Sequence, residues 1–172
     1  ACPKAQRAPI PYAWALLGLA GVGYISLSLE ILWFRLLSFL SGSRPEVFGV
    51  LLAVSLAGIG WGAWEAERQS HDDGRARVLA VRALVLAAVG TFFALPLVSW
   101  TTALAGKGVG LALGYAAAGL VAYWCGRTFP TLVQLGTPDD TSSAAMPVAW
   151  LYFGNIVGAA FGPLVTGFVL LD

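Results

Sequence analysis

The chain has 172 residues, of which 58% are hydrophobic and only 11% are charged, and its net charge is +1. An average soluble domain has about 25% charged residues, so this composition excludes a soluble globular protein and indicates a chain that lies in a lipid bilayer. The small net charge provides no basic surface for a phosphate backbone, which excludes nucleic-acid binding.

Residues 1–11 precede the first apolar stretch and contain three prolines. Proline lacks a backbone N–H and interrupts regular structure, so we expect an irregular tail here. The apolar stretch that follows is too long for the core of a secretory signal, which has about 7–15 residues, and no typical cleavage site closes it. We therefore expect this stretch to remain in the protein as its first membrane helix.

Stretches of about 20 apolar residues are long enough to span a bilayer as α-helices. Five such stretches follow one another along the chain, at 12–40, 45–64, 78–100, 108–128 and 147–171. The segments between them are too short for a soluble domain. The sequence thus predicts an all-α fold, in which residues 12–172 form one integral-membrane bundle of about five transmembrane helices.

Lysine and arginine residues gather at one end of the predicted bundle. That end has Lys4, Arg7, Arg68, Arg75, Arg77, Arg82 and Arg127, and the other has Arg44 and Lys107, with Arg35 buried nearer to it. Positive residues next to membrane helices are retained in the cytoplasm. We therefore expect a cytoplasmic N-terminus, and an odd number of crossings then places the C-terminal end outside.

The first predicted helix has two charged residues in apolar surroundings, Glu30 and Arg35. A charged side chain at the centre of a membrane helix costs about 2.5–3.5 kcal/mol on insertion scales, so we expect Glu30 to face protein, water or a bound group. The two side chains point about 140° apart on a helix and are poor partners for each other. Arg35 can extend to the interface, and Asn155 is a candidate partner for Glu30.

Glycines recur every four residues in two of the predicted helices. They are Gly110 and Gly114 in the fourth helix, and Gly154, Gly158 and Gly162 in the last. Such spacing leaves a flat helix face on which another backbone packs closely. A helix of the same bundle is the expected partner, while another subunit or a flat cofactor stays open.

Residues that bind metals or act as nucleophiles are few. The single histidine, His71, lies in a polar segment, and the two cysteines, Cys2 and Cys125, are far apart. We therefore expect no metal site and no intrinsic cofactor. No nucleophile–base pair is recognisable, so we expect no enzyme. A bound lipid stays open, as does a pigment or haem held mainly by partner chains.

Three stretches, 27–37, 126–132 and 151–171, resemble the membrane region of bacterial spermidine-synthase-like (polyamine aminopropyltransferase-like) integral membrane proteins. In that family the membrane helices are usually joined to a soluble catalytic domain, whose motifs are not found in these residues. The resemblance implies a multi-pass protein of the bacterial inner membrane. It marks Glu30, Arg35 and Asn155 as positions that the membrane fold uses, with Arg127 and Pro130 in a turn.

Two functions fit these features. The first is a non-catalytic accessory or scaffold subunit that docks onto other membrane subunits of a larger complex, such as an electron-transfer or photosynthetic one. The alternative is a transporter or channel for a small cation or a polyamine, with Glu30 as the binding carboxylate. The helix count favours the subunit, because transporters usually contain an internal repeat and five helices do not divide into equal halves.

Overall fold

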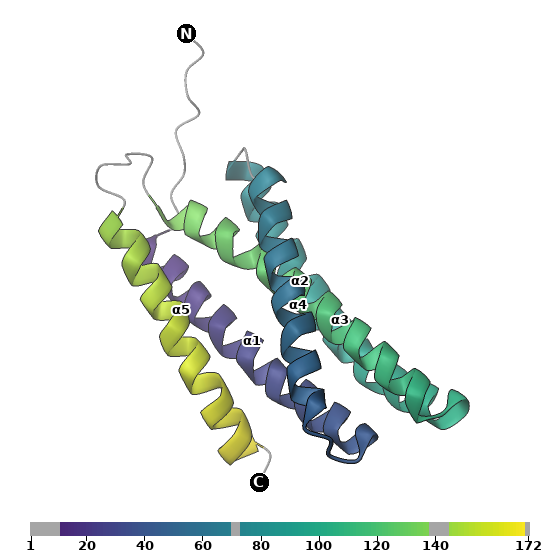
Figure 1. Cartoon of the computed structure of the whole chain (residues 1–172). Helices are drawn as coiled ribbons and strands as arrows, with labels where there is room; N and C mark the ends of the chain where they lie inside the picture. The colour runs from purple at the N-terminus through teal and green to yellow at the C-terminus, as the bar shows by residue number, and fades with distance from the viewer. Residues whose placement is uncertain (1–10, 70–72, 138–144, 171–172) are drawn as a thin grey trace.

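A computed structural model describes residues 11–69, 73–137 and 145–170. Within these ranges the fold is all-α (Figure 1). The helices are α1 (Tyr12–Ser41), α2 (Glu46–Gln69), α3 (Asp73–Ala105), α4 (Lys107–Gly136) and α5 (Ala145–Val165), followed by the π-helical segment η1 (Thr166–Leu170). Five helices are long and apolar enough to cross a membrane. The prediction of an all-α bundle with five candidate membrane helices is therefore confirmed.

Several helices extend beyond the apolar stretches that predicted them. α2 continues to Gln69 and α3 begins at Asp73, so much of the polar segment between the second and third stretches is helical. Glutamate, alanine, arginine and glutamine lower the hydropathy of a segment but are good helix formers. The apolar stretch is thus shorter than the helix that contains it.

The predicted turn at Arg127 and Pro130 is wrong. Both residues lie inside α4, which continues to Gly136. A proline removes one hydrogen bond from a helix interior, but membrane helices tolerate this loss because neighbouring groups satisfy the freed carbonyl. Proline was therefore a poor signal for the end of this helix.

Two short connections depend on glycine. Gly42 ends α1 with φ at 77°, in the left-handed region, and its N–H donates to the carbonyl oxygen of Ser38. Gly106 has φ at 89° and is the only residue between α3 and α4. Glycine reaches these angles without a steric penalty. Both connections are short enough to place consecutive helices side by side.

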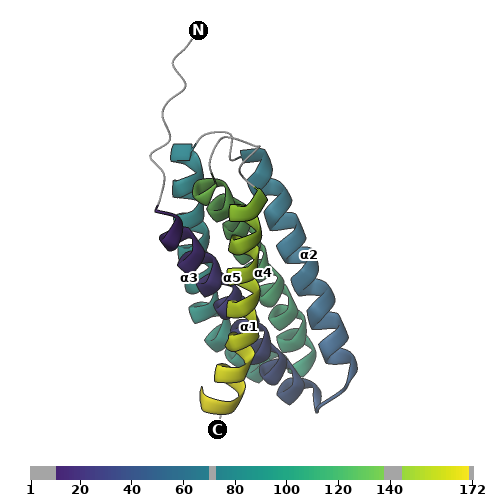
Figure 2. The same ribbon diagram turned by 90° about the vertical axis from the view of Figure 1, so that its left-hand side faces the viewer.

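The helix α4 is the centre of the bundle. It packs against α1, α2 and α3, whereas α5 packs mainly on α1, and α1 and α3 do not pack directly on each other (Figures 1 and 2). The beginning of α1 and the end of η1 lie at opposite ends of the bundle (Figure 1). This arrangement fits an odd number of crossings but does not show which end faces the cytoplasm.

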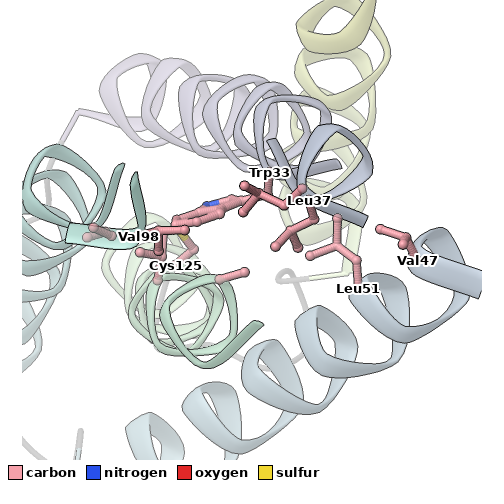
Figure 3. Close-up of a cluster of buried hydrophobic side chains, with 11 residues drawn as sticks. Trp33, Leu37, Val47, Leu51, Val98 and Cys125 are labelled. Atoms are coloured by element: carbon pink, nitrogen blue, oxygen red, sulfur yellow. The ribbon is translucent and has the colours of Figure 1, made fainter. Parts of the chain in front are cut away.

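The largest buried cluster lies where the first four helices meet (Figure 3). It includes Trp33 and Leu37 of α1, Leu51 of α2, Val98 of α3 and Cys125 of α4. A smaller cluster joins α1 to α5. Outside these clusters, large apolar side chains such as Phe93 and Phe168 are more than half exposed. An exterior of this kind suits contact with lipid rather than water.

Candidate functional site

The contact between α2 and α4 depends on glycines. A Cβ atom added at Gly62 would overlap the carbonyl oxygen of Tyr123, and one added at Gly126 would overlap that of Ile59. Only glycine therefore permits the two backbones to approach so closely. The close approach lets polar side chains near the end of α2 reach those of α4.

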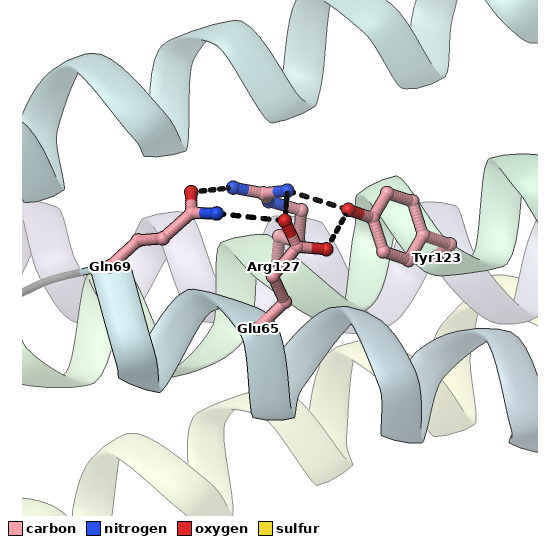
Figure 4. A network of polar contacts seen from close by, with 4 residues as sticks. All are labelled: Glu65, Gln69, Tyr123 and Arg127. Atoms are coloured by element: carbon pink, nitrogen blue, oxygen red, sulfur yellow. Dashed lines mark hydrogen bonds and ion pairs between the residues drawn. The ribbon is translucent and has the colours of Figure 1, made fainter.

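Four of these side chains form a hydrogen-bonded network, here named the Arg127 quartet (Figure 4). Arg127 Nη1 donates to the hydroxyl oxygen of Tyr123 at 2.6 Å and lies 3.2 Å from Glu65 Oε1. Arg127 Nη2 donates to Gln69 Oε1 at 2.6 Å. The Tyr123 hydroxyl donates to Glu65 Oε2, and Gln69 Nε2 donates to Glu65 Oε1 at 2.7 Å. Both oxygens of the Glu65 carboxylate thus accept hydrogen bonds.

Burial explains why Arg127 needs these partners. The residue is only 6% exposed, and an uncompensated charge at such a place costs several kcal/mol. The guanidinium also lies 5.5 Å from the ring centroid of Tyr123 and 5.3 Å from that of Trp124, where the negative ring faces attract a cation. The quartet therefore fastens α2 to α4 through both terminal nitrogens of Arg127, whereas its buried Nε has no hydrogen-bond partner among the described residues.

Sequence reasoning missed the quartet, although a signal for it exists. Glu65 and Gln69 are four residues apart, as are Tyr123 and Arg127, so each pair shares one helix face. Two polar i, i+4 pairs at the ends of apolar stretches indicate polar faces. Which faces meet, however, depends on the packing of α2 on α4.

A second polar site, the Glu30 cavity, lies where α1, α2 and α4 meet. Its volume is about 40 Å³, and its polar lining residues are Ser26, Glu30, Trp33, Ser55 and Cys125. Glu30 Oε1 is buried and has no hydrogen-bond partner among the described residues. The same holds for the indole N–H of Trp33, a residue that is 3% exposed. An acceptor and a donor thus border one cavity large enough for a water molecule.

The structure separates Glu30 from its suggested partner. Asn155 lies against Gly23 of α1, where its Oδ1 would be 2.9 Å from an added Cβ atom. Within the described part of the chain no hydrogen bond joins it to Glu30 Oε1, so the suggested pairing is wrong. Arg35 is exposed on α1 and makes a contact of its own, and its expected extension to the interface stays a prediction.

The glycines of the two predicted stripes face helices of this same chain. A Cβ atom added at Gly158 would overlap the carbonyl oxygen of Ala20, and one at Gly162 would overlap that of Tyr24. Gly154 faces Leu16 of α1, Gly110 faces Thr102 of α3, and Gly114 faces Leu37 of α1. All five glycines therefore contact another helix of the same bundle, and these contacts leave no room on their faces for another subunit or a flat cofactor.

An apolar groove of about 610 Å³ lies between α1 and α3. Val22 and Leu29 of α1, Leu84 and Phe92 of α3 and Cys125 of α4 are among its lining residues. No charged side chain lines it, so its chemistry suits an acyl chain or a flat apolar ring. Among the described residues, no group of three or more histidine, cysteine, aspartate or glutamate side chains could hold a metal ion. His71 lies outside these residues.

Comparison of the chain with protein-family models, curated proteins and solved structures finds no match. The fold and the apolar exterior nevertheless define its class, which is that of multi-pass helical membrane proteins. The narrower resemblance to spermidine-synthase-like proteins stays a prediction.

Proposed function

We propose that the chain is a non-catalytic accessory or scaffold subunit of a larger complex in the bacterial inner membrane, with its N-terminus in the cytoplasm. The observation that carries this proposal is a face of α2 formed by Gly49, Ala53, Ala57 and Gly60, here named the outer stripe. All four residues are exposed, and a Cβ atom added at either glycine would meet nothing within 4 Å.

The two faces of α2 explain why the outer stripe matters. On the opposite face Gly58 and Gly62 pack against α4, so one small-residue face of this helix is already in use. Small residues four apart are typical of contacts between membrane helices, because they let backbones approach and gain dispersion energy. The outer stripe offers the same geometry without a partner among the described residues. In our proposal, a transmembrane helix of a different protein packs on the outer stripe.

The arginine-rich end of the bundle supports the proposed orientation. Arg68, Arg75 and Arg82 lie there and are exposed, as expected of cytoplasmic positive residues. Reporter fusions to the N- and C-terminal ends test this part of the proposal. A cytoplasmic location of both ends would contradict it.

Site-specific photo-crosslinking in native membranes tests the docking. A photoreactive residue at Ala53 is expected to yield an adduct with another membrane polypeptide, and Gly49→Leu is expected to abolish it by widening the contact. Ala160 is the matched control position, because it is an exposed alanine on α5. An adduct of twice the mass of this chain would show self-association instead, and no adduct would show that the outer stripe faces lipid. Either result overturns the proposed docking.

The second candidate function is transport of a small cation, favoured by the Glu30 carboxylate, whose Oε1 has no hydrogen-bond partner among the described residues. A volume of about 40 Å³ exceeds the roughly 10–15 Å³ that a cavity needs to hold one water molecule, so a small cation has room beside Glu30. Cation flux into liposomes that contain the purified chain, lost in Glu30→Gln, would favour transport over the subunit proposal. Absence of flux in the wild-type chain would remove this candidate.

A further inference from the structure

Three arginines line a groove between the end of α2 and the beginning of α3, here named the arginine groove. Its volume is about 680 Å³, and its charged lining residues are Arg68 of α2 and Arg75 and Arg82 of α3. Gln69, Gly74, Val78 and Leu79 complete the lining. Among the described residues, no acidic side chain lines the groove, which distinguishes it from the neutralised Arg127 quartet.

The three guanidinium groups remain accessible to a ligand. All three arginines are exposed, and no ion pair joins them to a carboxylate among the described residues. Arg68 is held over the Trp64 ring, 3.7 Å from its centroid, which orders the side chain without neutralising its charge. Three positive charges thus converge on one exposed groove.

The surface next to the groove changes from charged to apolar along α3. Arg75 and Arg82 are seven residues apart, or about 10 Å along the helix axis. At helical spacing the same face continues with Leu86, Val89 and Phe93, which are 39%, 46% and 62% exposed. Charge at the end of the bundle therefore passes into an apolar strip that follows the membrane helix.

The geometry points to a binding site for the phosphate group of an anionic phospholipid, with its acyl chains along Leu86, Val89 and Phe93. Guanidinium groups bind phosphate oxygens through paired hydrogen bonds, and basic pockets between membrane helices are suited to anionic headgroups. Inorganic phosphate shares this chemistry but would leave the apolar strip unused. The strip therefore favours the lipid as the source of the phosphate.

Lipid titration of the purified full chain in neutral detergent tests the site. Phosphatidylglycerol is the probe, phosphatidylcholine is the zwitterionic comparison, and binding is measured by native mass spectrometry. The variant R75Q/R82Q is compared with R44Q/K107Q, which removes the same charge at the opposite end of the bundle. Each basic residue contributes about 1 kcal/mol, or about fivefold in affinity. We expect R75Q/R82Q to bind phosphatidylglycerol about 25-fold more weakly, and R44Q/K107Q to bind it like the wild-type chain.

Four results would overturn the proposal. An equal loss in both double variants would show a general effect of net charge, and equal binding of phosphatidylcholine would show that the headgroup charge is not recognised. Displacement of phosphatidylglycerol by inorganic phosphate at equal concentration would assign the groove to free phosphate. The variant R75K/R82K controls for damage to the fold, because it changes the same two residues and keeps their charges. It should bind more tightly than R75Q/R82Q, and failure to do so contradicts a charge-based site.

Discussion

Glu65 and Glu30 are two carboxylates in one membrane bundle, and their surroundings are opposite. Both oxygens of Glu65 accept hydrogen bonds, and its side chain pairs with the buried Arg127. Glu30 Oε1 is buried beside a cavity of about 40 Å³ and has no partner among the described residues. The same functional group therefore fastens two helices at one place and borders a small cavity at the other.

The length of the neighbouring side chains accounts for this difference. Near the end of α2, the long side chains of Gln69, Tyr123 and Arg127 reach the Glu65 carboxylate with their donor groups. Around Glu30, the polar side chains from α2 and α4 are the short ones of Ser55 and Cys125. Short side chains leave space between the helices, and a water molecule or a small ion can supply the missing contact. Glu65 thus holds two helices together, whereas Glu30 keeps one carboxylate oxygen without a hydrogen-bond partner among the described residues.

The largest expected effect comes from separating α2 and α4. Gly62→Leu should lower the free energy of unfolding by about 3 kcal/mol or more, because its Cβ atom would overlap the backbone of Tyr123. Gly60→Leu is the matched control, since an added Cβ atom there meets nothing within 4 Å. Denaturant unfolding of the isolated chain in detergent measures both. Equal stability of the two variants would show that the close approach is not needed for the quartet.

Removal of the Glu65 charge should have the next largest effect. Glu65→Gln leaves Arg127, whose side chain is 7% exposed, without a counter-charge, and we expect a loss of about 2–3 kcal/mol. The double variant Glu65→Leu with Arg127→Met removes both charges and should recover most of this loss, since apolar pairs replace buried ion pairs well. The same unfolding assay measures both. A double variant less stable than Glu65→Gln would contradict the assignment of the loss to the unpaired arginine.

A smaller effect is expected for Tyr123→Phe. The hydroxyl donates to Glu65 and accepts from Arg127, and hydrogen bonds to charged groups contribute about 1.5 kcal/mol or more. The ring remains, so its contact with the guanidinium is kept. Tyr152→Phe on α5 is the control, because that side chain is about half exposed and takes no part in the hydrogen bonds of the quartet. A Tyr123→Phe variant as stable as this control would show that the hydroxyl does not bridge the ion pair.

Glu30→Gln should change stability least and in the opposite direction. The substitution removes a charge whose Oε1 has no partner, so we expect stability to be unchanged or to rise by about 1 kcal/mol at most. Unfolding at neutral pH measures the sign. A loss comparable to that of Glu65→Gln would mean that Glu30 is a structural residue like Glu65, and the contrast between the two carboxylates would fail.

The sequence by itself determined the class of the fold. Long apolar stretches have few ways to satisfy their backbone in a bilayer, so they form helices that cross it. For this reason the five helices could be predicted from hydropathy alone, and Glu30 could be singled out by its apolar surroundings. The positions of the helix ends could not be predicted in this way, because the polar residues after residue 64 and the proline at 130 are compatible with a helix that continues.

Only the tertiary structure decided which faces meet. Gly58 and Gly62 look no different in sequence from Gly49 and Gly60, yet the first two pack on α4 and the other two are exposed. Arg127 resembled an ordinary interfacial charge until Glu65 and Gln69 were found opposite it. Periodicity describes the faces of one helix at a time, whereas a partner for a buried charge depends on the rotation and spacing of two helices. Both are set by close packing along their whole length.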